Sequence, residues 1–276
     1  MSDTNAQIIP PEGRKKRVFV ERDFFSEPTG ALIKTTLVDF PGRVASSLFL
    51  KGCNLRCPYC YNWELIDASL GSNANVSEPV SEAPLSTINE VLSHLEKRRN
   101  VLTGFVISGG EPLLFPHLAD LISEAKKLGF KIKLDTNGTL PERLQTIMEN
   151  PATAPDFIAM DIKTSPERYG IVTPHAKKSA SVQDIAEKLA RSASLIATLP
   201  STSREWRTVL VPPMVKKEDI DAIAALLPKD ASWQFAQFRN ENCLDASYND
   251  IAPYTDAQAT ELVSYARTLI SGAQLR

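Results

Sequence analysis

A chain of 276 residues with 43% hydrophobic and 23% charged residues has the composition of a globular protein, and its length suits one large domain. The formal net charge of -2 gives no general attraction to nucleic acid or anionic membranes, so neither is expected as a partner. The chain has no basic segment followed by an apolar stretch at its N-terminus and no uncharged apolar run of about 18 residues. We therefore expect no signal peptide and no membrane span, and we predict a cytoplasmic location.

Two stretches have compositions that do not favour a stable core. Residues 1–29 are polar, interrupted by prolines and carry a basic run, which predicts a partly disordered extension with an edge segment at 18–20. Residues 67–84 are rich in Ser, Asn, Ala, Pro and Glu, which predicts a surface loop insertion. Residues 30–276 are expected to form the folded domain.

From residue 44 onward, patterns of buried strands alternate with patterns of amphipathic helices. Apolar and β-branched stretches predict strands at 44–50, 104–108, 131–135, 157–162, 206–211 and 233–238. Apolar residues at helical spacing predict helices at 88–95, 118–128, 141–149, 182–196, 219–227 and 262–269. We expect Ser86 to cap the first helix and Gly129 to follow the end of the second.

This alternation predicts the fold class. Strands joined by right-handed helical crossovers pair in parallel, so six such units predict an α/β fold, an open partial (β/α)6 barrel of parallel strands with outer helices. A closed barrel needs about eight strand and helix pairs, for which the chain has no room. An open, doubly wound sheet is the alternative topology.

Polar residues recur where the predicted strands end. They are Cys53, Cys57 and Cys60 after the first strand, Ser108, Gly109, Gly110 and Glu111 at the second, Asp135 and Asn137 at the third, Asp161 and Lys163 at the fourth, Arg207 in the fifth, and Gln234 and Gln237 in the sixth. Tight turns or a strand-end ion pair explain each group taken singly. Because ligand sites form at the carboxyl ends of parallel strands, their recurrence at one rim favours a site.

Three of the four cysteines lie in one loop with the spacing C-x3-C-x2-C. Thiolates this close surround a metal centre more readily than they close a disulfide ring. An iron-sulfur cluster normally takes four cysteines, so three leave one iron open to a small molecule. A structural zinc needs a fourth ligand, for which the candidates are Cys243, His94, His117 and His175. The spacing alone leaves zinc and iron-sulfur open.

The cysteine motif, followed downstream by Gly109-Gly110-Glu111-Pro112, resembles the radical S-adenosylmethionine (SAM) superfamily. The resemblance covers about residues 30–245 and continues through KTTLVDFPG, GCNLRCPYCYN, ISGGEP, LDTNG, AMDIK and RTVLVP. It is strongest to the glycyl-radical-enzyme activases, in particular the activating protein of anaerobic ribonucleotide reductase and its pyruvate formate-lyase activating relatives. Residues 30–276 would then be a radical SAM domain.

The resemblance implies a role for each candidate residue. Cys53, Cys57 and Cys60 would ligate three irons of a 4Fe-4S cluster, and the fourth iron would take the amino and carboxylate groups of SAM. Gly109, Gly110 and Glu111 would bind the methionine amino group, and Tyr59 and Asn62 would lie near the adenine and the sulfonium. Asp135 and Asn137 would bind polar groups of the ribose or the methionine. Lys163 and Arg207 would bind the carboxylate, and Asp161 would orient Lys163.

The resemblance also implies a reaction. SAM would be cleaved reductively to methionine and a 5′-deoxyadenosyl radical, which would take a hydrogen from a glycine of a partner such as anaerobic ribonucleotide reductase. A flavodoxin- or ferredoxin-type donor would supply the electron. The alternatives are a radical SAM enzyme that modifies a small molecule, as deazaguanine-forming relatives do, and a zinc-stapled binding module without catalysis. Tyr61 stands where many activases have histidine, and Cys243 is expected to be a buried free thiol.

Overall fold

The computed structural model describes residues 25–66, 85–173 and 182–276. The predictions for the N-terminal extension up to residue 24, for the edge segment at 18–20 and for the loop 67–84 lie outside these residues. Within them, strand β1 already begins at Pro28 and Phe25 is buried in the main core, so the described fold includes residues before the expected boundary at 30.

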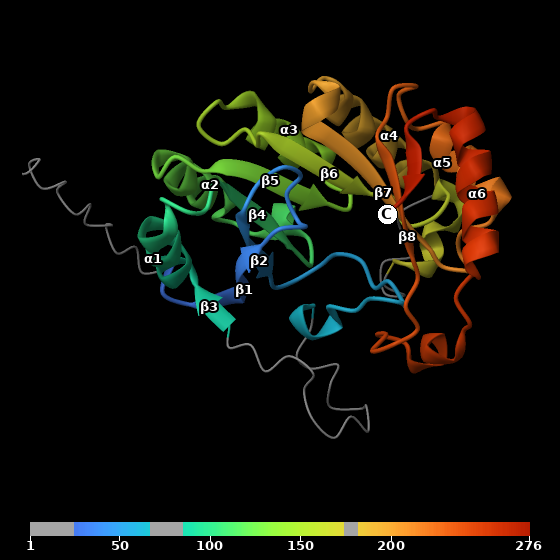
Figure 1. The fold of residues 1–276 in the computed structure, drawn as a ribbon, viewed down its shortest axis with the longest axis horizontal. Coiled ribbons are helices and arrows are strands. Elements are labelled where there is room, and N and C mark those ends of the chain that lie inside the picture. The colour runs from blue at the N-terminus through green and yellow to red at the C-terminus, as the bar shows by residue number, and fades with distance from the viewer. Residues whose placement is uncertain (1–24, 67–84, 174–181) are drawn as a thin grey trace, which may run out of the picture.

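The described residues form one nine-stranded sheet in the order β3-β1-β2-β4-β5-β6-β7-β8-β9 (Figure 1). From β2 to β9 neighbouring strands pair in parallel, whereas β1 pairs antiparallel with β2 and β3. The strands are β1 (Pro28–Thr36), β2 (Ala45–Leu50), β3 (Leu85–Thr87), β4 (Gly104–Gly109), β5 (Lys131–Thr136), β6 (Phe157–Asp161), β7 (Arg204–Leu210), β8 (Trp233–Gln237) and β9 (Ala273–Leu275).

The α-helices lie along the outer side of the curved sheet (Figure 1). They are α1 (Ile88–Arg98), α2 (Leu118–Lys127), α3 (Pro141–Glu149), α4 (Val182–Ala197), α5 (Lys217–Ala224) and α6 (Asp256–Leu269). Short 3-10 helices occupy several connections, namely η2 (Trp63–Leu65), η4 (Pro112–Leu114), η5 (Pro166–Ile171), η7 (Ser201–Ser203) and η8 (Ala246–Asp250).

The predicted α/β fold of six parallel βα units is confirmed. In the described chain, β2, β4, β5, β6, β7 and β8 are each followed by an outer helix before the next parallel strand. Helices on one side of a curved sheet correspond to the partial barrel and not to the doubly wound alternative (Figure 1). Strands β1, β3 and β9 were not predicted, since β3 and β9 have three residues each, too few for a periodic pattern.

The prediction that Ser86 caps α1 is wrong, and Thr87 is the cap. The Thr87 hydroxyl accepts a hydrogen bond from the Glu90 backbone N–H at 3.1 Å, and the Glu90 carboxylate accepts one from the Thr87 N–H at 2.8 Å. This reciprocal pair needs Glu or Gln three positions after the cap, which Thr87 has in Glu90 and Ser86 lacks. Gly129 follows the C-cap residue of α2 with a φ of 93°, as predicted.

Side chains alternate between the two faces of the sheet. On β5, Ile132 and Leu134 belong to the main core beneath the helices, whereas Lys133 and Asp135 form ion pairs on the opposite, inner face. The inside of the barrel is therefore partly polar.

The hairpin between β1 and β2 closes the amino-terminal end of the barrel. Phe40 from this hairpin is 4% exposed and joins Ala45, Val106 and Phe157 in a second core cluster, with its ring centroid 5.9 Å from that of Phe157. Asp39 next to it accepts a hydrogen bond from the Ser47 hydroxyl at 2.7 Å. This apolar closure leaves the carboxyl ends of the strands as the place for polar chemistry.

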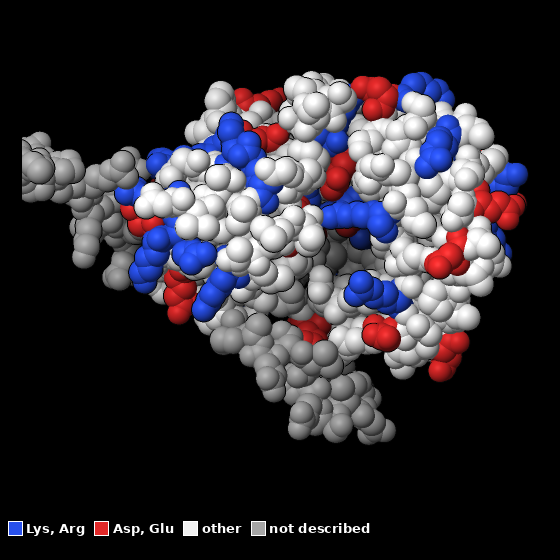
Figure 2. Space-filling model, in the orientation of Figure 1, with Lys and Arg blue, Asp and Glu red and all other residues white. Residues whose placement is uncertain are grey.

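Acidic and basic side chains are interspersed on the face shown in Figure 2. Across the described segments, none of the helices combines the length and the apolar character that crossing a bilayer requires.

Replacement of Phe40 by alanine should lower the free energy of unfolding by about 3–5 kcal/mol, because it leaves a cavity against Phe157. Urea denaturation measures the change. Leu37→Ala in the same hairpin is the control, since Leu37 is 73% exposed and its truncation should cost less than about 0.5 kcal/mol. Equal losses in the two variants would show that Phe40 does not close the barrel.

Candidate active site

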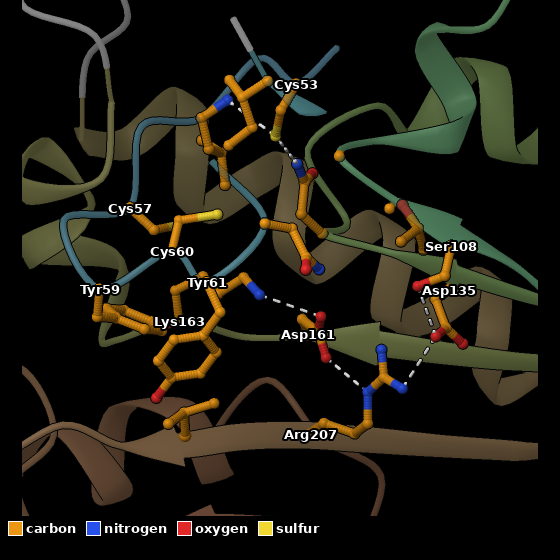
Figure 3. Close-up of a pocket in the computed structure, with 18 residues that line it drawn as sticks. Cys53, Cys57, Tyr59, Cys60, Tyr61, Ser108, Asp135, Asp161, Lys163 and Arg207 are labelled. Atoms are coloured by element: carbon orange, nitrogen blue, oxygen red, sulfur yellow. Dashed lines mark hydrogen bonds and ion pairs between the residues drawn. The ribbon is translucent and has the colours of Figure 1, made fainter. Parts of the chain in front are cut away.

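A pocket with a volume of about 260 Å³ lies at the carboxyl ends of β2, β4, β5, β6 and β7 (Figure 3). Of the residues predicted for the site, the pocket is lined by Cys53, Cys57, Tyr59, Cys60, Asn62, Gly109, Gly110, Asp135, Asn137, Asp161, Lys163 and Arg207. Ser108, which belongs to the same set of strand-end residues, lines it as well, and the other lining residues are Leu55, Tyr61, Ile66, Thr136 and Val209. Glu111, Gln234 and Gln237 are not among them. The structure thus brings most of the candidates to one place, and their roles toward a ligand stay predictions.

The cysteine loop leaves β2 through Gly52, whose φ of 86° lies in the left-handed region. The loop is closed by a hydrogen bond from the Gly52 N–H to the Leu65 carbonyl at 2.7 Å. It is anchored from the other side by the Leu244 N–H, which donates to the Cys60 carbonyl at 3.2 Å. Backbone contacts to separate segments of the chain therefore set the position of the thiols.

All three thiols of the loop are free, and they are held in a poorly solvated environment. Burial raises the pKa of Cys57 to about 12 and that of Cys53 to about 11, and it raises the pKa of Cys60 as well. Since thiolates are the metal-binding form, metal binding here must displace protons, which the positive charge of the metal favours.

The donor set fits a cluster better than a single ion. In the parts of the chain that the structure describes, no group of three or more His, Cys, Asp or Glu side chains is placed to hold one metal ion. The proposed fourth zinc ligands Cys243, His94 and His117 do not line the pocket, and His175 lies outside the described residues. Cys243 is a buried free thiol, as predicted. Three thiols that line one pocket suit a cluster with one iron left open.

Two glycines join the rim of β4 to the cysteine loop. A Cβ atom on Gly109 would lie 2.3 Å from the Leu50 nitrogen, and one on Gly110 would lie 2.0 Å from the Gly52 carbonyl oxygen. The Gly110 N–H donates to the Leu50 carbonyl at 2.9 Å. A side chain at either position would push the two segments apart, so the glycines allow a backbone approach that other residues prevent.

Glu111 is not among the residues that line the pocket, and its expected role as a SAM contact stays a prediction. Its carboxylate is 1% exposed and accepts hydrogen bonds from the backbone N–H groups of Leu113 and Asn137 and from the Thr136 hydroxyl, at 3.0, 2.7 and 2.9 Å. Burial raises its pKa to about 7, although the hydrogen bonds act in the opposite direction. These donors occupy the carboxylate, which therefore shapes the loop after β5.

The Asn137 side chain connects that loop to the cysteine motif. Its amide donates to Asn54 Oδ1 at 2.9 Å and lies 3.9 Å from Cys53 Sγ, and its oxygen accepts from the Thr139 hydroxyl at 2.6 Å. Asn54 in turn donates to the Thr139 hydroxyl at 2.7 Å. Asn54 and Thr139 were not predicted as site residues, because an amide or a hydroxyl side chain alone does not indicate a specific chemistry in a sequence.

Four charged residues form a connected network across β5, β6 and β7. Asp161 accepts from Arg207 Nε at 2.6 Å and from Lys163 Nζ at 3.0 Å, and Asp135 accepts from Arg207 Nη1 at 3.1 Å and from the Ser108 hydroxyl at 3.0 Å (Figure 3). Burial opposes ionisation of both carboxylates, but the positive charges of Arg207 and Lys133 together outweigh it for Asp135, and those of Arg207 and Lys163 outweigh it for Asp161. The pKa values of Asp135 and Asp161 are therefore lowered, and both remain ionised near neutral pH.

Lys133 and Glu205 extend this network below the pocket and were missed from the sequence. Lys133 Nζ lies 2.6 Å from Asp135 Oδ1 and 3.7 Å from Glu205 Oε1. A signal was present, because each is a charged residue two positions before a predicted site residue on the same strand, Lys133 before Asp135 and Glu205 before Arg207.

Tyr59 and Tyr61 form the aromatic side of the pocket. The Tyr59 ring packs edge-on against Phe238 and Tyr61, with centroids 6.4 and 6.5 Å away. Its hydroxyl is buried and makes no hydrogen bond to the described residues. The Tyr61 hydroxyl accepts from the Arg239 N–H at 2.7 Å. Tyr61 is thus held by the segment that follows β8.

Comparison with known families assigns the class of this site. The sequence model of the Radical SAM superfamily matches residues 47–227, so the chain belongs to that superfamily and is a radical SAM enzyme. Membership implies a 4Fe-4S cluster and SAM, with which the motif of Cys53, Cys57 and Cys60 is consistent.

Over 250 residues the chain is 25% identical to a Methanocaldococcus jannaschii protein whose name provisionally assigns it to the glycyl-radical enzyme activating enzymes. That match covers 89% of this chain and 94% of the other. The pyruvate formate-lyase-activating enzyme of Staphylococcus aureus is 34% identical over 46% of this chain and 49% of its own. A 7-carboxy-7-deazaguanine synthase of Methanopyrus kandleri is 30% identical over 45% of this chain and 51% of its own.

Among solved structures, TYW1 with a lysine-pyruvate adduct bound superposes with a TM-score of 0.52 and 15% sequence identity. The superposition covers 81% of this chain and 73% of TYW1. At this identity the likeness supports the fold alone.

Gly110→Ala should prevent normal assembly of the site, because its Cβ would force the rim of β4 away from the cysteine loop, at a cost of about 1–3 kcal/mol. Iron and sulfide bound per chain after anaerobic reconstitution measure the effect. Gly170→Ala is the control, since a Cβ atom there meets nothing within 4 Å. Full cluster loading of Gly110→Ala would contradict the close approach.

Proposed function

We propose that this radical SAM enzyme is an activase that generates a glycyl radical on a partner protein. The observation that carries the proposal is the match, over nearly the full length of both chains, to a relative named for glycyl-radical enzyme activation. The shared region with a pyruvate formate-lyase-activating enzyme supports it further. The pocket supports the chemistry, because three thiols and a row of charged strand ends surround one space.

We assign the cluster to Cys53, Cys57 and Cys60. When bound and reduced, the cluster supplies the electron that cleaves SAM to methionine and a 5′-deoxyadenosyl radical. The residues of the chain hold the reactants: three thiolates are the protein ligands, and no fourth cysteine lines the pocket. One coordination position is thereby left to the substrate. The burial of Cys57, which is 8% exposed, limits access of bulk water to this side of the pocket.

The remaining pocket residues would bind SAM. We assign the backbone of Gly109 and Gly110 to its amino group, and Lys163 and Arg207 to its carboxylate, since they are the cationic side chains that line the pocket. Asp161 holds both cations by hydrogen bonds and so orients them. The main contribution of the protein to the reaction is to hold SAM in one orientation beside the cluster, because reactants in a fixed geometry react faster than reactants that must meet by diffusion.

Other assignments are a SAM adenine and sulfonium contact by Tyr59 and Asn62 and a ribose or methionine contact by Asp135 and Asn137, all of which line the pocket. For Glu111 we now propose a supporting role through the loop after β5, given its hydrogen bonds to Thr136 and Asn137.

For the partner, we propose a glycyl radical protein such as anaerobic ribonucleotide reductase, with a flavodoxin- or ferredoxin-type electron donor. We propose that the protein works in the cytoplasm under anaerobic conditions. The small-molecule alternative has its own support in the match to a 7-carboxy-7-deazaguanine synthase, although that match covers about half of each chain.

Incubation of the reconstituted, reduced protein with SAM and a candidate glycyl radical protein should produce a glycyl doublet in the electron paramagnetic resonance spectrum of the partner. The experiment is anaerobic, with omission of SAM as the control. SAM cleavage to 5′-deoxyadenosine without a doublet on any candidate, together with turnover of a small deazaguanine precursor, would favour the alternative.

Cys57→Ala should abolish both the cluster and SAM cleavage, because two thiols cannot hold the cluster. Cys243→Ala is the matched control, since this thiol lies outside the pocket lining. It should retain the absorbance of the cluster and the formation of 5′-deoxyadenosine. Activity in Cys57→Ala, or its loss in Cys243→Ala, would refute the ligand assignment.

A further inference from the structure

A second layer of charge lies inside the barrel, beneath the pocket. Lys133 is among the largest fully buried side chains, with a side-chain exposure of 1%, and Glu205 is 6% exposed. Neither residue lines the pocket, so neither is placed to contact a ligand directly. Buried charges are costly unless they are paired, so their presence on the inner face requires a reason.

The strand register shows how the two layers are related. Parallel partners point to the same face, and residues two apart on a strand form successive rows. From the closed end toward the pocket, the rows are Lys133 with Phe157, then Asp135 with Ala159 and Glu205, then Asp161 with Arg207. Lys133 therefore reaches up from the row next to the apolar closure, while its partners lie between it and the pocket.

Lys133 forms ion pairs with two buried carboxylates. Its Nζ atom lies 2.6 Å from Asp135 Oδ1 and 3.7 Å from Glu205 Oε1. The same two carboxylates approach Arg207 Nη1 at 3.1 and 4.0 Å. Asp135 and Glu205 thus share two cations, Lys133 beneath the pocket floor and Arg207 at the floor itself. Glu205 Oε1 is buried and forms no hydrogen bond to the described residues, so its interactions are purely those of charge.

The charges of the combined network balance. Lys133, Lys163 and Arg207 oppose Asp135, Asp161 and Glu205 within a set of contacts that are all 4.0 Å or shorter. Loss of the positive charge of Lys133 would leave both Asp135 and Glu205 to be neutralised by Arg207. The guanidinium would then be held more tightly toward the barrel floor and would be less able to face a bound anion.

We propose that Lys133 and Glu205 are positioning residues that set the charge and orientation of Asp135 and Arg207 toward the carboxylate of SAM. This inference rests on the proposed function, because it takes SAM as the ligand of Arg207. Lys133 neutralises Asp135 and Glu205, which lie between it and Arg207. Arg207 therefore remains available to a ligand in the pocket. Glu205 offsets the excess positive charge that Lys133 alone would bring into the barrel.

A double-mutant cycle of Lys133→Met and Glu205→Gln tests the role, because the two changes alter the network charge in opposite directions. SAM affinity is measured by anaerobic titration calorimetry on reconstituted, unreduced protein, with cluster content and thermal unfolding recorded for each variant. Lys133→Met should weaken SAM binding by roughly tenfold or more. The double variant, whose network is again neutral, should bind SAM within roughly threefold of the unaltered protein.

Two further variants separate charge from packing. Lys131→Met is the control, because Lys131 lies on the same strand but is 53% exposed and pairs with Asp156 outside the pocket. It should leave SAM affinity unchanged. Lys133→Arg keeps the charge and should bind SAM better than Lys133→Met. If Lys133→Met does not fold, SAM binding by Glu205→Gln that is at least as tight as in the unaltered protein, together with retention of binding by Lys133→Arg, still supports the role.

Additive losses in the cycle, with the double variant binding more weakly than either single variant, would overturn the proposal and indicate a packing role. Unchanged affinity in Lys133→Met at full cluster content would overturn it as well. Failure of the unaltered, cluster-loaded protein to bind SAM is a different result, because it refutes the proposed function itself.

Discussion

The guanidinium of Arg207 is the interaction on which the site depends. It joins Asp135 on β5 and Asp161 on β6 from its own place on β7, at 3.1 and 2.6 Å. A buried ion pair stabilises only when its geometry satisfies every charge, so these contacts require one strand register and one height in the barrel. The parallel sheet supplies that register, and the network in turn fixes the pocket floor before any ligand arrives.

The two halves of the pocket are positioned by different forces. Backbone hydrogen bonds and close glycine contacts hold the cysteine loop, through Gly52, Gly109 and Gly110. Charged side chains hold the opposite wall. The Asn137 amide connects the two, since it reaches the cysteine motif from the loop whose N–H is bound by Glu111. Glu111 is therefore important for the site although it does not line the pocket.

The sequence predicted the parts of this arrangement that follow from a repeating rule. Strand and helix periodicity predicted the six βα units, and the convergence of strand ends predicted most of the residues that share the pocket. What it missed depends on three-dimensional contacts. The direction of the Glu111 carboxylate, the capping by Thr87 and the pairing of β1 across a hairpin involve partners that no periodic pattern specifies.

Lys133 illustrates the limit most clearly. Its position between Ile132 and Leu134 in a predicted buried strand is unexpected for a lysine, because burial of an unpaired lysine is costly. Its closest partner Asp135 is two residues away on the same strand, but Glu205 comes from β7, which is far away in the chain, so this second pairing is visible only in the folded sheet. A polar barrel interior of this kind also explains the apolar hairpin closure at Phe40. Water entering from that end would raise the local dielectric constant and weaken each ion pair above it, so the closure preserves the strength of the charges that face the pocket.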